Sequence, residues 1–211
     1  MTTAADVTID WTHELVEQLD WHWRAQLRPR LDGLTDAEYL WEPVPGCWSI
    51  RPRDQATSAM AAGAGDWVAD FEIPEPDPAP ITTIAWRLSH ISIGLFAMRA
   101  SAHFGDGSVS YQTTDWPATA AGALDLLDHS YEAWTSAVRV LDSDGLARAV
   151  GPAEGPWANH SMATLILHIN REAIHHGAEV SLLRDLYRAS FATASGVVAP
   201  SYGQQYGQDY G

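Results

Sequence analysis

Apolar side chains recur at helical spacing in four stretches of the chain, and loops rich in Pro and Gly separate these stretches. In the first stretch they stand four residues apart, at Leu15, Leu19, Trp23, Leu27 and Leu31. This spacing places the apolar side chains on one face of a helix. The pattern predicts four helices, at about residues 12–34, 81–104, 117–141 and 161–189.

Prolines and threonines indicate where these helices begin, bend or end. Pro29 is expected to kink or shorten the first helix, because a proline ring clashes with the preceding turn. Thr82 or Thr83 is a candidate N-cap of the second helix, and Pro117 suits the first turn of the third. No stretch shows a convincing alternating strand pattern. The chain is therefore expected to form an all-α four-helix bundle with long crossover loops.

The two ends of the chain differ in composition. Residues 191–211, ATASGVVAPSYGQQYGQDYG from position 192 on, are low in complexity and are expected to be disordered. Residues 1–190 are then expected to form a single domain, which agrees with the length of the chain, 211 residues.

The fourth predicted helix carries a stripe of ionisable side chains within the sequence LHINREAIHHGAE, residues 167–179. At helical spacing they fall within an arc of about 100°: His168, Glu172, His175, His176 and Glu179. Apolar residues occupy the other faces, so the helix is expected to be central and the stripe to face the interior or a cavity. Charged groups buried there are costly unless they are paired, protonated or bound to a metal.

Two interpretations of the stripe stay open at this point. In the first, Glu172 and His176, at positions i and i+4, bind one cation together with His90, which lies mid-helix among apolar residues. Two nitrogens and one carboxylate oxygen suit Zn²⁺, or else Ni²⁺ or another first-row ion, and three protein ligands leave positions open as in catalytic sites. In the second, the stripe is a metal-free network of hydrogen bonds.

The charge balance restricts the classes of partner. Twelve basic residues, all Arg, oppose 27 acidic ones, for a formal charge of −15. Such a surface repels phosphate backbones and anionic lipids, so nucleic-acid and membrane partners are disfavoured. The chain has no apolar run of about 18 residues and no signal-peptide pattern, and its single cysteine, Cys47, excludes an internal disulfide. A cytoplasmic protein is therefore expected.

Three stretches, in their order and separation, carry a resemblance to a known family: GLTDAEYLWEPVPGCWSIRPR, TTIAWRLSHI and HINREAIHHGAEVSLLRDLYR. From about residue 12 to 190 the chain resembles the DinB-like metal-binding four-helix proteins, which include mycothiol-dependent maleylpyruvate isomerases and thiol S-transferases. The resemblance implies an up-down-down-up bundle that binds a divalent metal.

The resemblance also implies one metal ligand from the second helix and two from the last. The second-helix position matches His90. Many members have His-x-x-x-His in the last helix, and one alignment would place Arg171 and His175 there, although Arg cannot ligate a cation. The Glu-x-x-x-His form of the mycothiol-dependent isomerases gives Glu172 and His176 instead. We prefer this second alignment, because it supplies two competent ligands.

The implied function is that of a metal-dependent thiol transferase or thiol-dependent isomerase, in which the metal activates a small thiol such as mycothiol toward an electrophilic small molecule. His175 or Glu179 would handle a proton, and Trp86 and Arg87 would hold the acceptor; Arg87 is equally a candidate partner for a stripe carboxylate. Two other classes stay open: a metal protein that binds or senses a ligand without turnover, and a metal-dependent hydrolase. Relatives often pair, so a homodimer is a further expectation.

Overall fold

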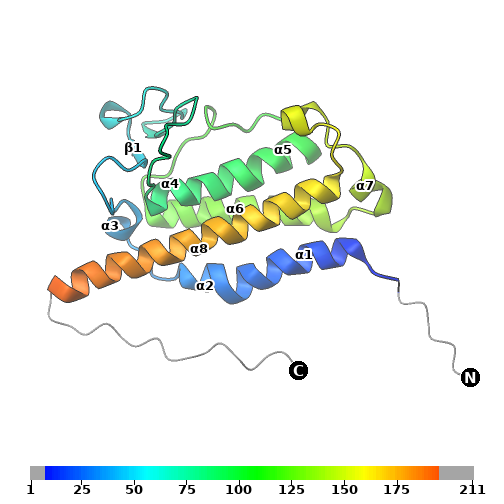
Figure 1. Ribbon diagram of the computed structural model, residues 1–211, viewed down its shortest axis with the longest axis horizontal. Helices are drawn as coiled ribbons and strands as arrows, with labels where there is room; N and C mark the ends of the chain where they lie inside the picture. The colour runs from blue at the N-terminus through cyan, green and yellow to red at the C-terminus, as the bar shows by residue number, and fades with distance from the viewer. Residues whose placement is uncertain (1–7, 195–211) are drawn as a thin grey trace, which may run out of the picture.

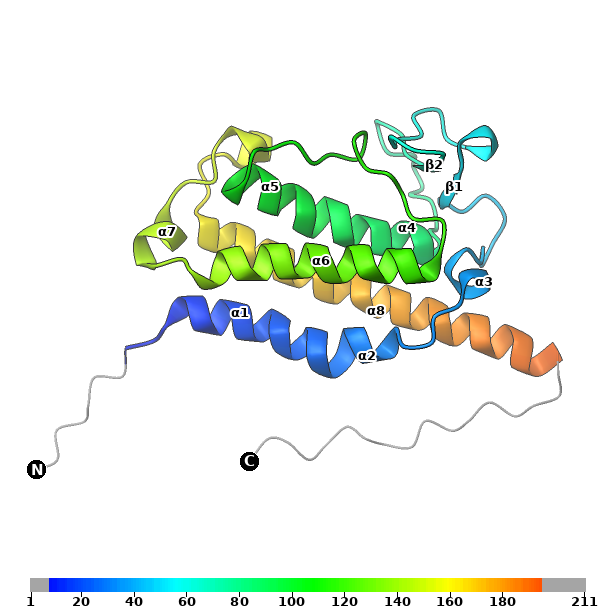
Figure 2. The same ribbon diagram turned by 180° about the vertical axis from the view of Figure 1, so that it is seen from behind.

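Four long helices lie side by side in the computed structural model, which describes residues 8–194 (Figures 1 and 2). Two of them pass through a π-helical segment, labelled η1 in the first and η3 in the second. Their parts, in chain order, are α1 (Trp11–His22), η1 (Trp23–Leu27), α2 (Arg28–Arg30), α4 (Ile84–Ser89), η3 (His90–Ala97), α5 (Met98–Phe104), α6 (Ala120–Arg139) and α8 (Met162–Ala194).

The helices follow the predicted up-down-down-up order. In Figure 2 the chain runs from left to right along α1, from right to left along α4 and α5 and again along α6, and from left to right along α8. Helix α6 and the second helix therefore run in the same direction, so residues 105–119 cross the length of the bundle to join them. The prediction of an all-α bundle with long crossover loops is confirmed.

The predicted helix starts are correct at one position and early at another. Thr83 caps α4, because its side chain accepts a hydrogen bond from the backbone N–H of Trp86, as expected. Thr119 caps α6, so Pro117 precedes the helix instead of lying in its first turn. The start of α6 is set by the Thr119 side chain, because it satisfies a free N–H of the first turn, and the nearby Pro117 has less influence.

The predicted helix ends also need correction at two positions. The first helix ends at Arg30. The wider turn of η1 ends at Leu27, and Pro29, two residues later, has no N–H and a fixed ring, so only a short final turn follows. Helix α8 continues to Ala194, past the predicted end at residue 189 and into the segment expected to be disordered. The rest of that segment, 195–211, lies outside the described residues.

The connections contain short elements that the pattern did not reveal. Strands β1 (Ile50–Pro52) and β2 (Trp67–Ala69) pair antiparallel, with Ile50 opposite Ala69. Three residues are too few for a visible alternation, which is why the sequence analysis found no strand. The remaining short elements are helical: α3 (Asp36–Tyr39), η2 (Arg53–Gln55), α7 (Ser143–Ala147) and η4 (Pro152–Trp157).

A buried carboxylate, that of Asp70, connects the end of β2 to the segments on both sides of β1. Asp70 is completely buried, and its oxygens accept hydrogen bonds from the N–H groups of Ser49, Thr57 and Ser58 and from Arg51. Burial alone would raise the pKa of Asp70, but these hydrogen bonds and the Arg51 charge outweigh it and hold the pKa below its usual range. An ionised group directly after β2 therefore holds the segments on both sides of β1 in place.

A second buried ion pair holds α8 against α3 and α2. Arg184 and Glu38, both almost fully buried, form a bidentate pair with distances of 2.6 Å (Nε to Oε1) and 3.0 Å (Nη2 to Oε2). Arg184 also donates to the backbone carbonyls of Arg30 and Asp32. Because a bidentate pair has a defined geometry, it sets where α8 lies relative to α3 and α2.

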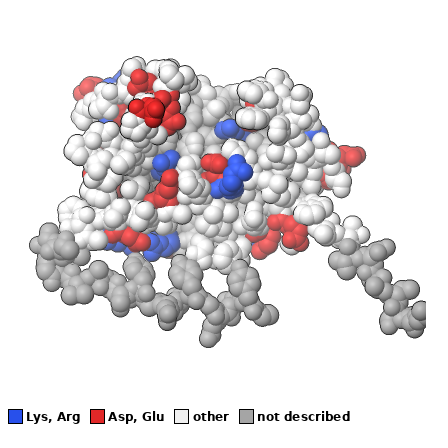
Figure 3. All heavy atoms as spheres, in the orientation of Figure 1, with Lys and Arg blue, Asp and Glu red and all other residues white. Residues whose placement is uncertain are grey.

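The surface in Figure 3 agrees with the acidic composition. Acidic side chains gather at the upper left of that face, over the region of β1 in Figure 1, and basic ones are few and scattered. Among residues 8–194 no helix has both the length and the apolar character needed to cross a membrane.

Candidate metal centre

His90 opens the π-helical segment η3 in the middle of the second helix. Its ring stacks on Trp86, with centroids 5.4 Å apart and planes 9° from parallel, and its Nδ1 lies 2.9 Å from the hydroxyl oxygen of Tyr111. Burial, together with the nearby His176, Arg87 and Arg99, lowers the pKa of His90 to about 3. The imidazole is therefore neutral near pH 7, the form that binds metals.

Gly94 provides the space in which Tyr111 reaches His90. A Cβ atom at Gly94 would lie 2.5 Å from the Tyr111 hydroxyl oxygen and 2.9 Å from His90 Nδ1, closer than real Cβ atoms come to either. Tyr111 belongs to the crossover between α5 and α6, and the sequence analysis did not identify it. The available signal was a glycine four residues after His90 inside a helix, since such a glycine often marks a close approach.

His176 of α8 faces His90 across the interior of the bundle. The ring centroids are 4.9 Å apart and nearly perpendicular, and the His176 side chain is only 12% exposed. Its Nδ1 lies 2.8 Å from Glu179 Oε2, and its Nε2 lies 3.5 Å from Glu172 Oε2. Burial lowers the pKa of His176 more than the hydrogen bond that it donates to Glu179 raises it.

Two of the predicted ligands, His90 and Glu172, each lie next to the third, His176, and the hydrogen bonds at both imidazoles suit coordination. In His90 and in His176 the Nδ1 atom is engaged, by Tyr111 and by Glu179, which leaves Nε2 for a metal. Metal-binding histidines commonly have their second nitrogen held by a carboxylate or another oxygen in this way. That His90, Glu172 and His176 bind one divalent cation together stays a prediction.

Among the described residues, the group of side chains whose ligand atoms are close enough to hold a metal ion is a different one. His175, His176 and Glu179 offer ligand atoms that all lie within 4.8 Å of one another. His175 is 63% exposed, and its Nε2 lies 3.4 Å from Glu179 Oε1. The two groups share His176, so a metal bound by one competes with a metal bound by the other.

Arg87 and Glu179 form an ion pair beside the cluster. Arg87 Nε lies 2.8 Å from Glu179 Oε2, the same oxygen that contacts His176, and the guanidinium lies 5.3 Å from the centre of the Trp86 ring. Of the two roles expected for Arg87, the structure shows the pairing with a carboxylate of the stripe. Glu179 is correspondingly held between Arg87 and His176.

Arg171 lies outside the cluster. Its side chain is 68% exposed, its Nη2 donates to His168 Nδ1 at 2.8 Å, and its Nε lies 3.3 Å from Glu172 Oε1. His175 is also exposed, so the alignment that would use Arg171 and His175 as the last-helix pair places neither against His90. The stripe as a whole is only partly turned inward, because the exposed fraction of its side chains rises from 12% at His176 to 63% at His175.

The two histidines line a pocket of about 480 Å³ between the second helix, the sheet region and the crossover that carries Tyr111. Its walls are aromatic, and two guanidiniums and two carboxylates supply its charges. The lining includes Trp48, Phe71, Trp86, Tyr111, Arg87 and Arg99. The predicted acceptor-binding residues Trp86 and Arg87 lie in the wall of this pocket next to His90. Of the predicted site residues on α8 only His176 lines it, and Glu172, His175 and Glu179 are outside its lining.

The comparison with protein families agrees with this geometry. A family model described as the DinB superfamily matches residues 54–180, which include both helices of the candidate centre. Neither the curated proteins nor the solved structures that were compared contain a significant match to the chain.

Proposed function

The chain belongs to the DinB superfamily, and from that premise we propose that it is a divalent-metal-dependent thiol transferase or thiol-dependent isomerase. The superfamily is typically metal-binding, and the proposal for this chain rests on one observation. Two neutral imidazoles, each with Nδ1 already engaged, lie next to each other in the wall of an aromatic pocket, and the Glu172 carboxylate lies 3.5 Å from Nε2 of one of them, His176.

Three protein ligands leave coordination positions for a substrate atom. When bound, the cation supplies positive charge that lowers the pKa of a coordinated thiol. We assign Zn²⁺ first, because two nitrogens and one carboxylate oxygen suit it, with Ni²⁺ or another first-row ion as alternatives.

The pocket residues have separate tasks in this proposal. Arg87 and Arg99 line the pocket, and their positive charges favour an anionic thiolate over a neutral thiol. Trp48, Phe71 and Trp86 offer flat apolar faces to an electrophilic small molecule and exclude water from it. Low-molecular-weight thiols such as mycothiol are the proposed co-substrates, and the cytoplasm, where thiols stay reduced, is the proposed compartment.

Two residues of α8, Glu179 and His175, have different tasks in the proposed reaction. Glu179 is shared by Arg87 and His176, so we assign it a positioning role that holds the His176 ring. His175 is exposed and lies 3.4 Å from the other oxygen of Glu179, so it is the candidate that passes the thiol proton to solvent.

The test is an assay of Zn²⁺-loaded protein with mycothiol and a panel of electrophiles, followed by thiol consumption. We expect turnover that falls to background in His90→Gln and is unchanged in His13→Gln, an exposed histidine of α1. Equal rates in wild type and His90→Gln would refute the proposal. Calorimetric binding of thiol without consumption of any electrophile would indicate a ligand-binding protein, and thiol-independent cleavage of esters or amides would indicate a hydrolase.

A further inference from the structure

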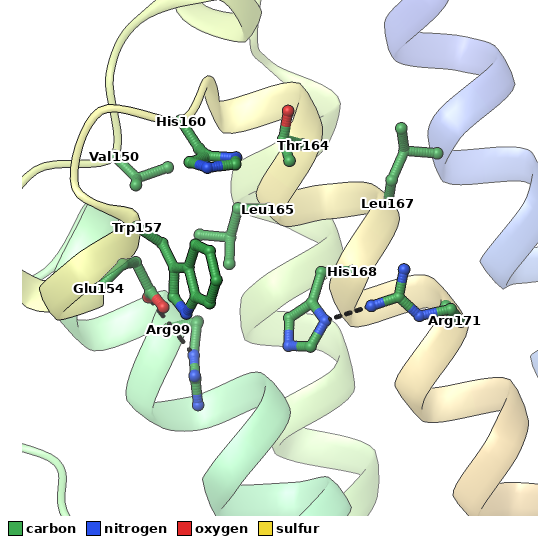
Figure 4. Close-up of a pocket in the computed structure, with 10 residues that line it drawn as sticks. All are labelled: Arg99, Val150, Glu154, Trp157, His160, Thr164, Leu165, Leu167, His168 and Arg171. Atoms are coloured by element: carbon green, nitrogen blue, oxygen red, sulfur yellow. Dashed lines mark hydrogen bonds and ion pairs between the residues drawn. The ribbon is translucent and has the colours of Figure 1, made fainter.

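A second pocket, of about 500 Å³, lies between Arg99 at the start of α5, η4 and the first turns of α8 (Figure 4). Trp157 and His160 come from the connection before α8, His168 and Arg171 from α8 itself, and Arg99 from α5. Arg99 also lines the pocket beside His90, so one side chain separates the two.

The hydrogen bond between Arg171 and His168 fixes which nitrogen of His168 carries its proton. A guanidinium has donors only, and Arg171 Nη2 lies 2.8 Å from His168 Nδ1, so Nδ1 must accept. The proton of the neutral ring is then on Nε2, and in Figure 4 that side of the ring is turned away from Arg171, toward the pocket. His168 therefore offers the pocket a donor.

The pocket lining contains one carboxylate, Glu154, whose Oε1 atom lies 2.9 Å from His103 Nε2 and 3.4 Å from Arg99 Nε. The hydroxyl of Thr164 is hydrogen-bonded to that of Ser161. Two guanidiniums, those of Arg99 and Arg171, line the pocket against this single carboxylate, so its lining carries an excess of positive charge in a chain whose formal charge is −15.

The remaining walls are apolar. The Trp157 side chain is 63% exposed, and its ring stands in Figure 4 between Leu165 and Glu154, facing the His168 side of the pocket. An exposed tryptophan at the mouth of a pocket supplies a flat surface for an aromatic or aliphatic body.

We propose that this second pocket binds a small organic carboxylate with an apolar body. The carboxylate accepts from His168 Nε2 and is attracted by Arg99, and the apolar body lies against Trp157 and Leu165. A neutral amide of the same shape lacks the charge that the pocket favours. The pocket lining contains none of the proposed metal ligands, although it shares Arg99 with the pocket beside His90 and its Arg171 contacts Glu172.

The test is calorimetric or NMR titration with 3-phenylpropionate and its neutral isostere, 3-phenylpropionamide. We expect the carboxylate to bind at least about tenfold more tightly than the amide, and His168→Phe to remove about that factor for the carboxylate alone. Trp157→Ala should weaken both probes. His13→Phe, which changes an exposed histidine on α1, should change neither.

Four results would overturn the proposal. The first three are equal affinity for the two probes, no saturable binding of the carboxylate up to about 10 mM, and equal affinities of His168→Phe and His13→Phe for the carboxylate. A fourth is carboxylate binding that disappears with chelator or in His90→Gln, because the carboxylate would then be bound at the metal centre.

Discussion

Gly94→Ala is expected to weaken metal binding without adding or removing any ligand. The new methyl group would lie 2.5 Å from the Tyr111 hydroxyl and 2.9 Å from His90 Nδ1, so one of these groups has to move. His90 is stacked on Trp86, and Tyr111 comes from a loop, so Tyr111 is the group expected to yield. The hydrogen bond that orients His90 is then lost.

The expected magnitudes follow from these contacts. Overpacking costs about 1–3 kcal/mol, and the lost hydrogen bond costs about 0.5–1.5 kcal/mol. Replacing a helical glycine by alanine returns about 0.5–1 kcal/mol. The free energy of unfolding should therefore fall by about 1–3 kcal/mol. Zn²⁺ affinity should fall by about 10- to 100-fold, as for other losses of a group that orients a metal ligand.

The assay combines urea unfolding with Zn²⁺ competition against a chromophoric chelator. Tyr111→Phe removes the same hydrogen bond, so the affinity losses of the two variants should not add when they are combined. Gly122→Ala, in the first turn of α6, controls for the change of glycine to alanine in a helix away from the site. Unchanged Zn²⁺ affinity in Gly94→Ala, or fully additive losses, would refute the reasoning.

Three further predictions concern the groups that hold the site in place. Arg184→Met should lower the free energy of unfolding by about 3–5 kcal/mol, because buried Glu38 loses its bidentate partner and keeps Arg188 Nε only at 3.8 Å, and Glu38→Leu in the same chain should restore part of it in denaturant titrations. The low pKa of Asp70 contributes stability that is present above the pKa of the unfolded chain, near 4, and is lost as the pH falls through the lower folded value. Asp70→Asn should accordingly be less stable than wild type at pH 7 and lose less stability on acidification in thermal melts, whereas identical acid profiles would contradict this. Glu179→Gln should reduce Zn²⁺ affinity by about tenfold through the ring of His176, and an unaltered affinity would rule out the positioning role.

The helices could be predicted because each carries a long apolar period, whereas their up-down-down-up order was expected from the family resemblance. The core side chains Leu19 and Leu27 are almost fully buried, and the four-residue spacing had placed them on one face of the first helix. The strands could not be predicted, because residues 50–52 and 67–69 pair through tertiary contacts that leave no periodic trace.

The site was predictable only in part, for a related reason. The stripe on α8 and the mid-helix position of His90 are local patterns, so His90, Glu172 and His176 could be proposed as neighbours. The partners that orient them depend on how distant segments fold together. Tyr111 reaches His90 from a crossover, and nothing in its own surroundings indicates that contact. The homodimer expected from the family resemblance stays a prediction.

The most direct test of the metal centre is a crystal structure of protein loaded with Zn²⁺, with anomalous diffraction collected at the zinc edge. Our account predicts one strong peak about 2.0–2.2 Å from Nε2 of His90, Nε2 of His176 and an oxygen of Glu172. Tyr111 and Glu179 should still contact the two Nδ1 atoms. A peak bound by His175 and Glu179, or no peak near His90 at full zinc loading, would contradict it.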